Sequence, residues 1–175
     1  MRYSTSHMTE LVLIAHNLRS AHNVGALLRT AEGLGVRQVF LTGYTPYPLA
    51  AGDDRLPHLA QKVDKRIAKT ALGAEKLVAW QYAPDINTVL AGLKKQGFAV
   101  AALEQSPYST KLPGFQPPAK LALIAGREIE GIEPEILAVC DHVLEIPMFG
   151  RKESFNVAQA AAMSLYHLRF SQNVL

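Results

Sequence analysis

The chain has 175 residues, enough to bury one substantial core, so a single domain is predicted over residues 1–175, with residues 1–10 as a flexible tail. It is 49% hydrophobic and 19% charged, which is typical of a soluble globular protein, and its longest apolar runs are too short to span a bilayer. A single cysteine excludes an intramolecular disulfide and a cysteine-rich zinc site. No secretory signal is visible, and we therefore expect a cytoplasmic protein with no membrane or metal partner.

The net charge of +3 is unevenly distributed along the chain. Most of the positive excess lies in one stretch, in Arg55, Lys62, Lys65, Arg66, Lys69 and Lys76. These cations have two interpretations, a phosphate-facing surface for nucleic acid or an ordinary solvated helix face. The charge alone permits a polyanionic partner without requiring one.

The first half of the chain alternates short apolar runs with helical patterns. In chain order they predict a strand at 11–15, a helix at 24–34, a strand at 39–41, a loop at 44–57, a helix at 58–73 and a strand at 77–80. Asn23 is placed as the N-cap of the first helix, and Gly33 and Gly35 end it.

The second half repeats this alternation. It predicts a helix at 86–96 capped by Asp85, a strand at 98–103, a proline-containing loop at 105–118, a strand at 121–125, a helix at 134–140, a strand at 143–146 and a helix at 156–170. Strands separated by helices indicate an α/β fold. We expect a mostly parallel sheet of about six strands with helices on both faces.

In the first of three segments with unusual polar residues, residues 17–29, Asn23 begins a predicted helix and Arg29 follows within it. Asn23 is explained equally well as a backbone cap or as a functional amide. Arg29 is expected either to pair with Glu32, three residues on, or to face an anion.

The second segment, residues 126–131, follows an apolar run and contains Gly126 and Gly131 on either side of a turn. Glycines at a strand end let a ligand approach the backbone closely. Glu128 between them either orients another polar group or caps the next turn. The spacing differs from the dinucleotide fingerprint, and no phosphate-binding P-loop is present in the sequence.

The third segment, residues 146–157, runs from a strand that stops at Pro147 into a small-residue helix. Ser154 and Asn156 have the spacing of turn and N-cap residues, yet such a strand-to-helix turn is also where open α/β folds bind ligands. The six histidines show no metal-binding spacing, and His16, His22 and His58 are expected at the surface or as caps.

Together the three segments resemble the signature motifs of the SpoU (TrmH-like) RNA 2′-O-ribose methyltransferases of the SPOUT superfamily. The matching pieces are residues 23–29, 124–132 and 146–157, and their order and spacing agree from about Leu11 to Leu168. Each motif alone is weak, whereas three in order are specific. Residues 69–75 also resemble the central segment of the family.

The resemblance implies a C-terminal trefoil knot, a homodimer with an active site shared across the interface, and S-adenosylmethionine as cofactor. It implies catalytic roles for Asn23, Arg29, Glu128, Ser154 and Asn156. It places the cofactor against Leu103, Glu104, Gly126, Ile146, Met148, Ser154 and Phe155. A ribose hydroxyl is a poor nucleophile, and the resemblance implies that Arg29 either helps to activate it or holds the adjacent phosphate. The phosphate role is favoured, because a guanidinium rarely loses its proton.

The expected substrate is a structured RNA, tRNA rather than rRNA, and the residues expected to contact it are Arg19, Arg127, Arg151 and Lys152, together with the basic region at 55–76. The sequence does not name the nucleotide. A non-catalytic RNA-binding protein on the same scaffold is the alternative, although the five catalytic-type positions are intact. An unrelated nucleotide-binding α/β protein would need a glycine-rich loop after the first strand, and residues 16–20 do not supply one.

Overall fold

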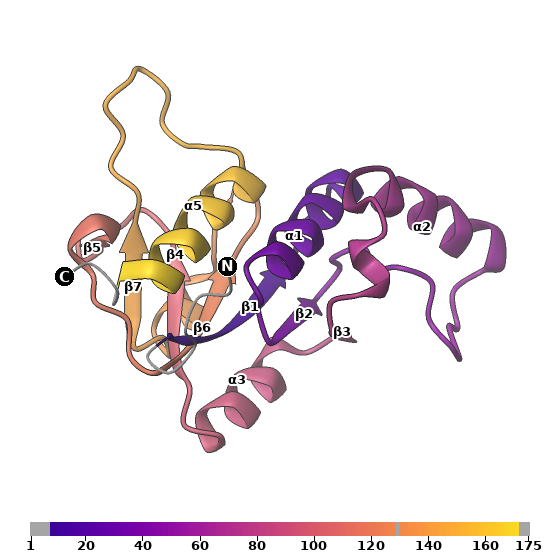
Figure 1. Ribbon diagram of the computed structural model, residues 1–175, viewed down its shortest axis with the longest axis horizontal. Coiled ribbons are helices and arrows are strands. Elements are labelled where there is room, and N and C mark those ends of the chain that lie inside the picture. Colours follow the sequence, from indigo (N-terminus) through magenta and orange to yellow (C-terminus); the bar gives the residue numbers. More distant parts are fainter. Residues whose placement is uncertain (1–7, 129, 172–175) are drawn as a thin grey trace, which may run out of the picture.

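The computed structural model describes residues 8–128 and 130–171 (Figure 1). Its described strands form one seven-stranded sheet in the order β3-β2-β1-β6-β4-β7-β5, and every pairing between them is parallel. The strands are β1 (Glu10–His16), β2 (Gln38–Thr42), β3 (Trp80–Ala83), β4 (Ala99–Leu103), β5 (Thr110–Lys111), β6 (Lys120–Ala125) and β7 (His142–Glu145). The predicted parallel α/β sheet is confirmed.

Helices cover both faces of this sheet, as expected. They are α1 (Ala21–Gly33), α2 (Pro57–Ala71), α3 (Ile86–Lys95), α4 (Pro134–Leu137) and α5 (Val157–Phe170). Side chains alternate along β1, so Leu11 and Leu13 join the core formed with α1, α2 and α5, while Val12 and Ile14 join the core formed with α3 and α4. Figure 1 shows α3 on the opposite side of the sheet from α1.

The strand register brings the ends of four strands to one edge of the sheet. Ala15 of β1 pairs with Ala125 of β6, Leu103 of β4 also pairs with Ala125, and Leu103 pairs with Leu144 of β7. The segments that follow β1, β6, β4 and β7 therefore leave the sheet side by side. In parallel sheets this carboxyl edge is where ligands bind.

The first helix begins earlier than predicted, and Asn23 is not its N-cap. Ser20 takes that place, because its Oγ accepts a hydrogen bond from the backbone N–H of Asn23 at 3.2 Å. Asn23 is the third residue of α1, and its side chain is left for contacts outside the helix. The N-cap predicted at Asp85 is confirmed, since its carboxylate accepts the N–H groups of Asn87 and Thr88.

Several predicted boundaries in the rest of the chain are wrong. The strand predicted at 77–80 lies later, at Trp80–Ala83, because Ala74–Lys76 forms the 3₁₀ helix η1 and Leu77 is exposed. The proline-containing loop at 105–118 includes the two-residue strand β5 and the 3₁₀ helix η2 (Leu112–Gly114). The short helix α4 ends at Leu137 rather than at residue 140. Local apolar patterns fix the presence of an element more firmly than its ends.

The predicted tail at 1–10 lies mostly outside the described residues. Within them, Thr9 is fully buried and Glu10 begins β1, so these two residues belong to the fold. Arg169 of α5 donates a hydrogen bond to the Thr9 carbonyl at 2.7 Å, which ties the start of β1 to the last helix. None of the helices over 8–128 and 130–171 combines the length and apolar character needed to cross a membrane.

Candidate active site

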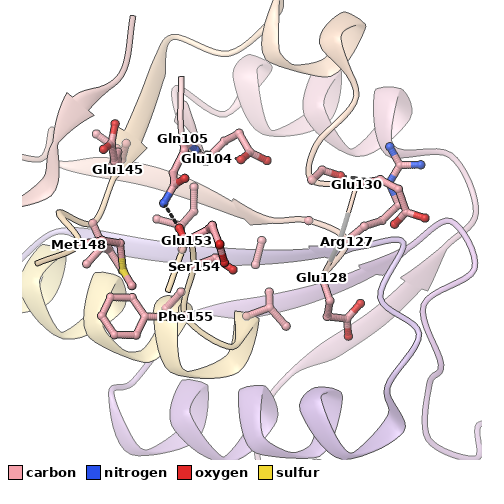
Figure 2. Close-up of a pocket in the computed structure, with 18 residues that line it drawn as sticks. Glu104, Gln105, Arg127, Glu128, Glu130, Glu145, Met148, Glu153, Ser154 and Phe155 are labelled. Carbon is pink, nitrogen blue, oxygen red and sulfur yellow. Dashed lines mark hydrogen bonds between the residues drawn. The ribbon is translucent and has the colours of Figure 1, made fainter. Parts of the chain in front are cut away.

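A cavity of about 300 Å³ opens at the carboxyl ends of β4, β6 and β7 (Figure 2). Its size lies at the lower end of the range for small-molecule sites. The seven residues predicted to hold the cofactor all line it, and they are Leu103, Glu104, Gly126, Ile146, Met148, Ser154 and Phe155. Residues that are distant in the sequence therefore meet around one space.

Glu104 fixes one wall of the cavity. Its carboxylate accepts the backbone N–H of Ile132 at 2.9 Å and that of Gln105 at 2.9 Å, which ties the end of β4 to the segment after β6. Gly131 makes this contact possible, because it has φ +70 and a Cβ there would lie 2.2 Å from a Glu104 carboxylate oxygen. The glycine is therefore needed because the Glu104 side chain packs directly against the backbone at this position.

The segment joining β7 to α5 forms the opposite wall and projects from the body of the molecule (Figure 1). Met148 and Phe155 supply apolar surface on this side (Figure 2). Gln105 Nε2 donates to the Glu153 carbonyl at 2.6 Å and so connects the two walls. Asn156 caps α5 as predicted, since its Oδ1 accepts the N–H of Ala158 at 2.9 Å.

Three of the predicted catalytic residues form a hydrogen-bonded chain beside the cavity. Asn23 Nδ2 donates to Glu128 Oε1 at 2.9 Å, and Asn156 Nδ2 donates to Asn23 Oδ1 at 3.3 Å. Glu128 and Ser154 line the cavity itself. Asn23 holds both neighbours through one amide, so the three signature segments are joined at this point.

Arg29, the fifth predicted catalytic residue, is not brought to this cavity. It is exposed on α1 and does not belong to the cavity lining. Within residues 8–128 and 130–171 it makes no hydrogen bond or ion pair, so the alternative prediction of a pair with Glu32 is wrong. Its guanidinium is therefore not committed to a structural contact within the described chain.

The residues predicted to contact RNA lie around the same edge. Arg127 lines the cavity and donates from Nε to the Gly131 carbonyl at 3.0 Å. Arg19 donates to Glu130 Oε1 at 2.8 Å, and more than half of its side chain is exposed. The other two, Arg151 and Lys152, are exposed on the projecting segment. Of these four cations, Arg127 lines the cavity and the other three lie outside its lining.

His16 lies beneath this edge and is buried, which contradicts the expected surface or capping position. Burial lowers the pKa of His16, so the neutral imidazole is favoured. Its Nδ1 lies 2.8 Å from Thr42 Oγ1, and its Nε2 lies 3.3 Å from Glu133 Oε2. Glu133 Oε1 also lies 3.5 Å from Arg127 Nη2, so this polar cluster supports the segment that carries Glu128.

The cavity is lined by more negative than positive charge. Five glutamates and one arginine face it, and the glutamates are Glu104, Glu128, Glu130, Glu145 and Glu153. Hydrogen bonds from Lys111 and then Ser109 hold the pKa of Glu145 below its usual range, which keeps this carboxylate ionised. Such a lining favours a cationic ligand over a polyphosphate. Among the described residues, no three His, Cys, Asp or Glu side chains gather as a metal site.

Sequence patterns missed Gln105, Glu145 and Glu153 as cavity residues. Gln105 and Glu145 lie at the carboxyl ends of β4 and β7. Because ligands bind at these strand ends in parallel sheets, the predicted strand boundaries alone could have indicated both residues. Glu153 carries no such signal, because its place depends on the Gln105 contact across the cavity. Contacts of this kind depend on tertiary structure.

The chain is similar to members of one family of RNA methyltransferases. The family model of the SpoU rRNA Methylase family matches residues 10–166. The tRNA (guanosine(18)-2′-O)-methyltransferase of Aquifex aeolicus is 27% identical over 90% of this chain and 67% of its own length. The 23S rRNA (guanosine-2′-O-)-methyltransferase RlmB of Neisseria meningitidis serogroup B is 31% identical over 91% of this chain. The present chain spans 58% of that relative's length.

The fold is shared with solved structures. The SpoU methyltransferase AviRb from Streptomyces viridochromogenes, in complex with AdoMet, superimposes with a TM-score of 0.77 at 19% identity, over 94% of this chain and 58% of AviRb. An AdoMet-bound rRNA methyltransferase from Sinorhizobium meliloti gives a TM-score of 0.78 at 19% identity, over 96% of this chain and 58% of that one. At this identity the superposition shows a common fold.

Proposed function

The chain belongs to the SpoU rRNA methylase family of the SPOUT superfamily, and on this basis we propose that it methylates a ribose 2′-hydroxyl in structured RNA with S-adenosylmethionine as donor. The observation that carries the proposal is the chain of hydrogen bonds from Glu128 through Asn23 to Asn156 at the side of the cavity. It brings together amide and carboxylate groups that can hold a nucleotide next to a bound donor.

The residues present fit S-adenosylmethionine. The cavity combines an apolar wall, formed by Ile146, Met148 and Phe155, with five carboxylates suited to a sulfonium and an ammonium group. Leu103, Glu104, Gly126 and Ser154 complete the proposed donor site. When bound, the donor would supply a methyl group on a positively charged sulfur. Transfer would form a bond between this methyl and the ribose oxygen and break its bond to sulfur, leaving a neutral thioether, and the hydroxyl proton would be released to solvent.

The residues around the cavity position the acceptor nucleotide. Asn23, Ser154 and Asn156 hold the ribose and its phosphate in line with the methyl group, and Glu128 orients the Asn23 amide. No protein nucleophile takes part, because the substrate hydroxyl attacks directly. Arg29 acts through the phosphate of the substrate, and because it lies outside this cavity we assign it to the cavity of a partner subunit in a homodimer.

We propose tRNA as the substrate. The relatives differ on this point, since the Aquifex protein is named for tRNA and the Neisseria protein for 23S rRNA. We also propose that the protein works in the cytoplasm, where these RNAs are found. We further propose that the C-terminal part of the chain forms the trefoil knot of the family. A non-catalytic RNA-binding role is less well supported, because Asn23, Glu128 and Asn156 remain joined in one network.

Titration calorimetry with S-adenosylmethionine, followed by transfer of labelled methyl groups to RNA, tests this function. We expect one donor site per chain and transfer to unmodified tRNA transcripts in preference to rRNA fragments. Preferred transfer to rRNA would overturn the choice of tRNA alone. Absence of donor binding by the folded protein would overturn the enzymatic function and leave the RNA-binding alternative.

A further inference from the structure

The α2 basic stripe, formed by Lys62, Lys65, Arg66 and Lys69, is a surface that the proposed active site does not use. Because successive helical residues are about 100° apart, these four positions fall within an arc of about 100° on one side of α2. All four side chains are exposed. The buried residues of the helix, Ala60, Ile67 and Ala71, lie on the opposite side. The helix therefore presents to solvent a strip that carries these four cations and His58.

The stripe has no compensating acid. None of its four cations makes an ion pair with any residue in 8–128 or 130–171, and Asp64 within α2 accepts a backbone N–H instead, at 2.9 Å. Some cations elsewhere are paired, such as Arg37 with Glu10 at 2.5 Å and Lys94 with Asp141 at 3.9 Å. Like charges three and four residues apart repel one another along a helix. An external anion would relieve this repulsion.

The structure also separates the stripe from the other two cations of the predicted basic region. The Arg55 guanidinium donates to Asp53 at 2.8 Å and lies 3.6 Å from the centre of the Tyr47 ring, so it is committed to its own loop. Lys76 belongs to η1 and lies outside α2. The candidate surface is therefore four residues on one helix rather than six along the sequence.

The position of α2 indicates the size of the anion. Figure 1 shows α2 at the end of the molecule away from β4 and β7, with α1 in between, whereas the cavity lies at the ends of β4, β6 and β7. A single nucleotide cannot contact both places. A structured RNA can, because its phosphates continue along the helix at regular spacing.

We propose that the α2 basic stripe binds the phosphate backbone of the substrate RNA, away from the nucleotide that is methylated. The identification of RNA rests on the proposed function, but the charge and exposure of the stripe do not. A symmetric dimer contact in which the stripe meets its own copy does not fit, because two such surfaces would repel each other. The stripe would contribute affinity without base specificity, since phosphates carry no sequence information.

The test uses a double variant with a matched control. K65Q/K69Q removes two charges from the stripe, and K94Q/K95Q removes two charges from α3 on the other face of the sheet. Binding of a fluorescently labelled tRNA transcript is measured by anisotropy over a range of salt concentrations, without S-adenosylmethionine. Each lost phosphate contact lowers the slope of log affinity against log salt by about 0.7–0.9.

We expect K65Q/K69Q to raise the Kd at 0.1 M salt by about tenfold or more and to lower the slope by about 1.5, with little change in the control. Unchanged thermal unfolding and donor binding would show that the fold is intact. A Kd and slope equal to those of the control would overturn the proposal and leave the stripe to another partner. If RNA binds as expected but no methyl group is transferred, the proposed function fails and the stripe stands.

Discussion

At the scale of single residues, Asn23 is the connection on which the proposed site depends most. Its amide donates to Glu128 at 2.9 Å and accepts from Asn156 at 3.3 Å. A hydrogen bond to a charged group is worth about 1.5–3 kcal/mol, which corresponds to roughly 10–150-fold in rate if it is needed in the transition state. Asn23→Ala is therefore expected to lower the rate of methyl transfer by one to two orders of magnitude.

Single-turnover transfer to tRNA measures this effect, and calorimetry checks the donor site in the same variant. Donor affinity should change by less than about threefold, because Asn23 lies outside the cavity lining. Asn87→Ala, on the exposed surface of α3, serves as the control. A full rate in Asn23→Ala would contradict a positioning role for this residue.

Arg55 and Asp53 give a prediction on pH dependence. Hydrogen bonding to Arg55, foremost among the causes, lowers the pKa of Asp53 to about 2. Because the folded-state value lies below that of the unfolded chain, the stabilisation is fully present at neutral pH and is lost as the pH falls toward about 2. In Arg55→Gln the Asp53 pKa should rise toward its ordinary range.

Carboxyl-carbon NMR titration reports this pKa in both proteins. The melting temperature of Arg55→Gln should fall below that of the wild type at pH 7, and the difference should narrow in acid as Asp53 protonates. Identical titration curves for Asp53 in the two proteins would contradict the assigned cause.

At the scale of elements, the contact between α1 and α2 depends on Gly25. A Cβ at this position would lie 2.2 Å from both the Ile67 carbonyl oxygen and Thr70 Oγ1. The helices would have to move apart, so Gly25→Ala should lower the free energy of unfolding by about 1–3 kcal/mol. Gly33→Ala is the matched control, because nothing lies within 4 Å of the added carbon at that end of α1.

Urea unfolding of both variants compares the two positions directly. The free energy of unfolding of Gly33→Ala should be within about 1 kcal/mol of the wild-type value. The higher helix propensity of alanine favours a small increase in this free energy. Equal stability of the two variants would show that α1 and α2 separate without cost. Such a result would also weaken the view of α2 as a rigid support for its basic stripe.

Sequence patterns predicted most elements of this fold, for a physical reason. Buried parallel strands read as continuous apolar runs, which is why residues 11–15 and 121–125 were recognised as β1 and β6. β3 was misplaced because Leu77 continues an apolar run yet is exposed beside η1. β5 has two residues and exists only through its pairing with β7, which no local pattern reveals.

At the scale of the whole molecule, the resemblance to one family located the cavity residues that periodicity left ambiguous. The apparent N-cap Asn23 shows the difference, since its side chain serves Glu128 while Ser20 caps the helix. The strand order, with β6 between β1 and β4, places the three signature segments at one edge. This order arises from contacts between distant parts of the chain, and sequence periodicity does not encode it.

The proposed donor site and the proposed RNA-binding stripe lie in different parts of the molecule. The cavity and its hydrogen-bonded chain lie at the ends of β4, β6 and β7, and the α2 basic stripe lies beyond α1 (Figure 1). Donor chemistry and much of the RNA affinity are therefore expected to respond to different substitutions. Variants of the stripe should change RNA affinity and its salt dependence, whereas variants of the network should change the rate of transfer.

The most direct test of the central claim is nucleoside mass spectrometry of tRNA transcripts incubated with the protein and S-adenosylmethionine. We expect a nucleoside with its added methyl group on the ribose 2′-oxygen, formed by the wild type and strongly reduced in Asn23→Ala. A methyl group on a base, or no methylated nucleoside from tRNA or rRNA despite donor binding, would contradict it.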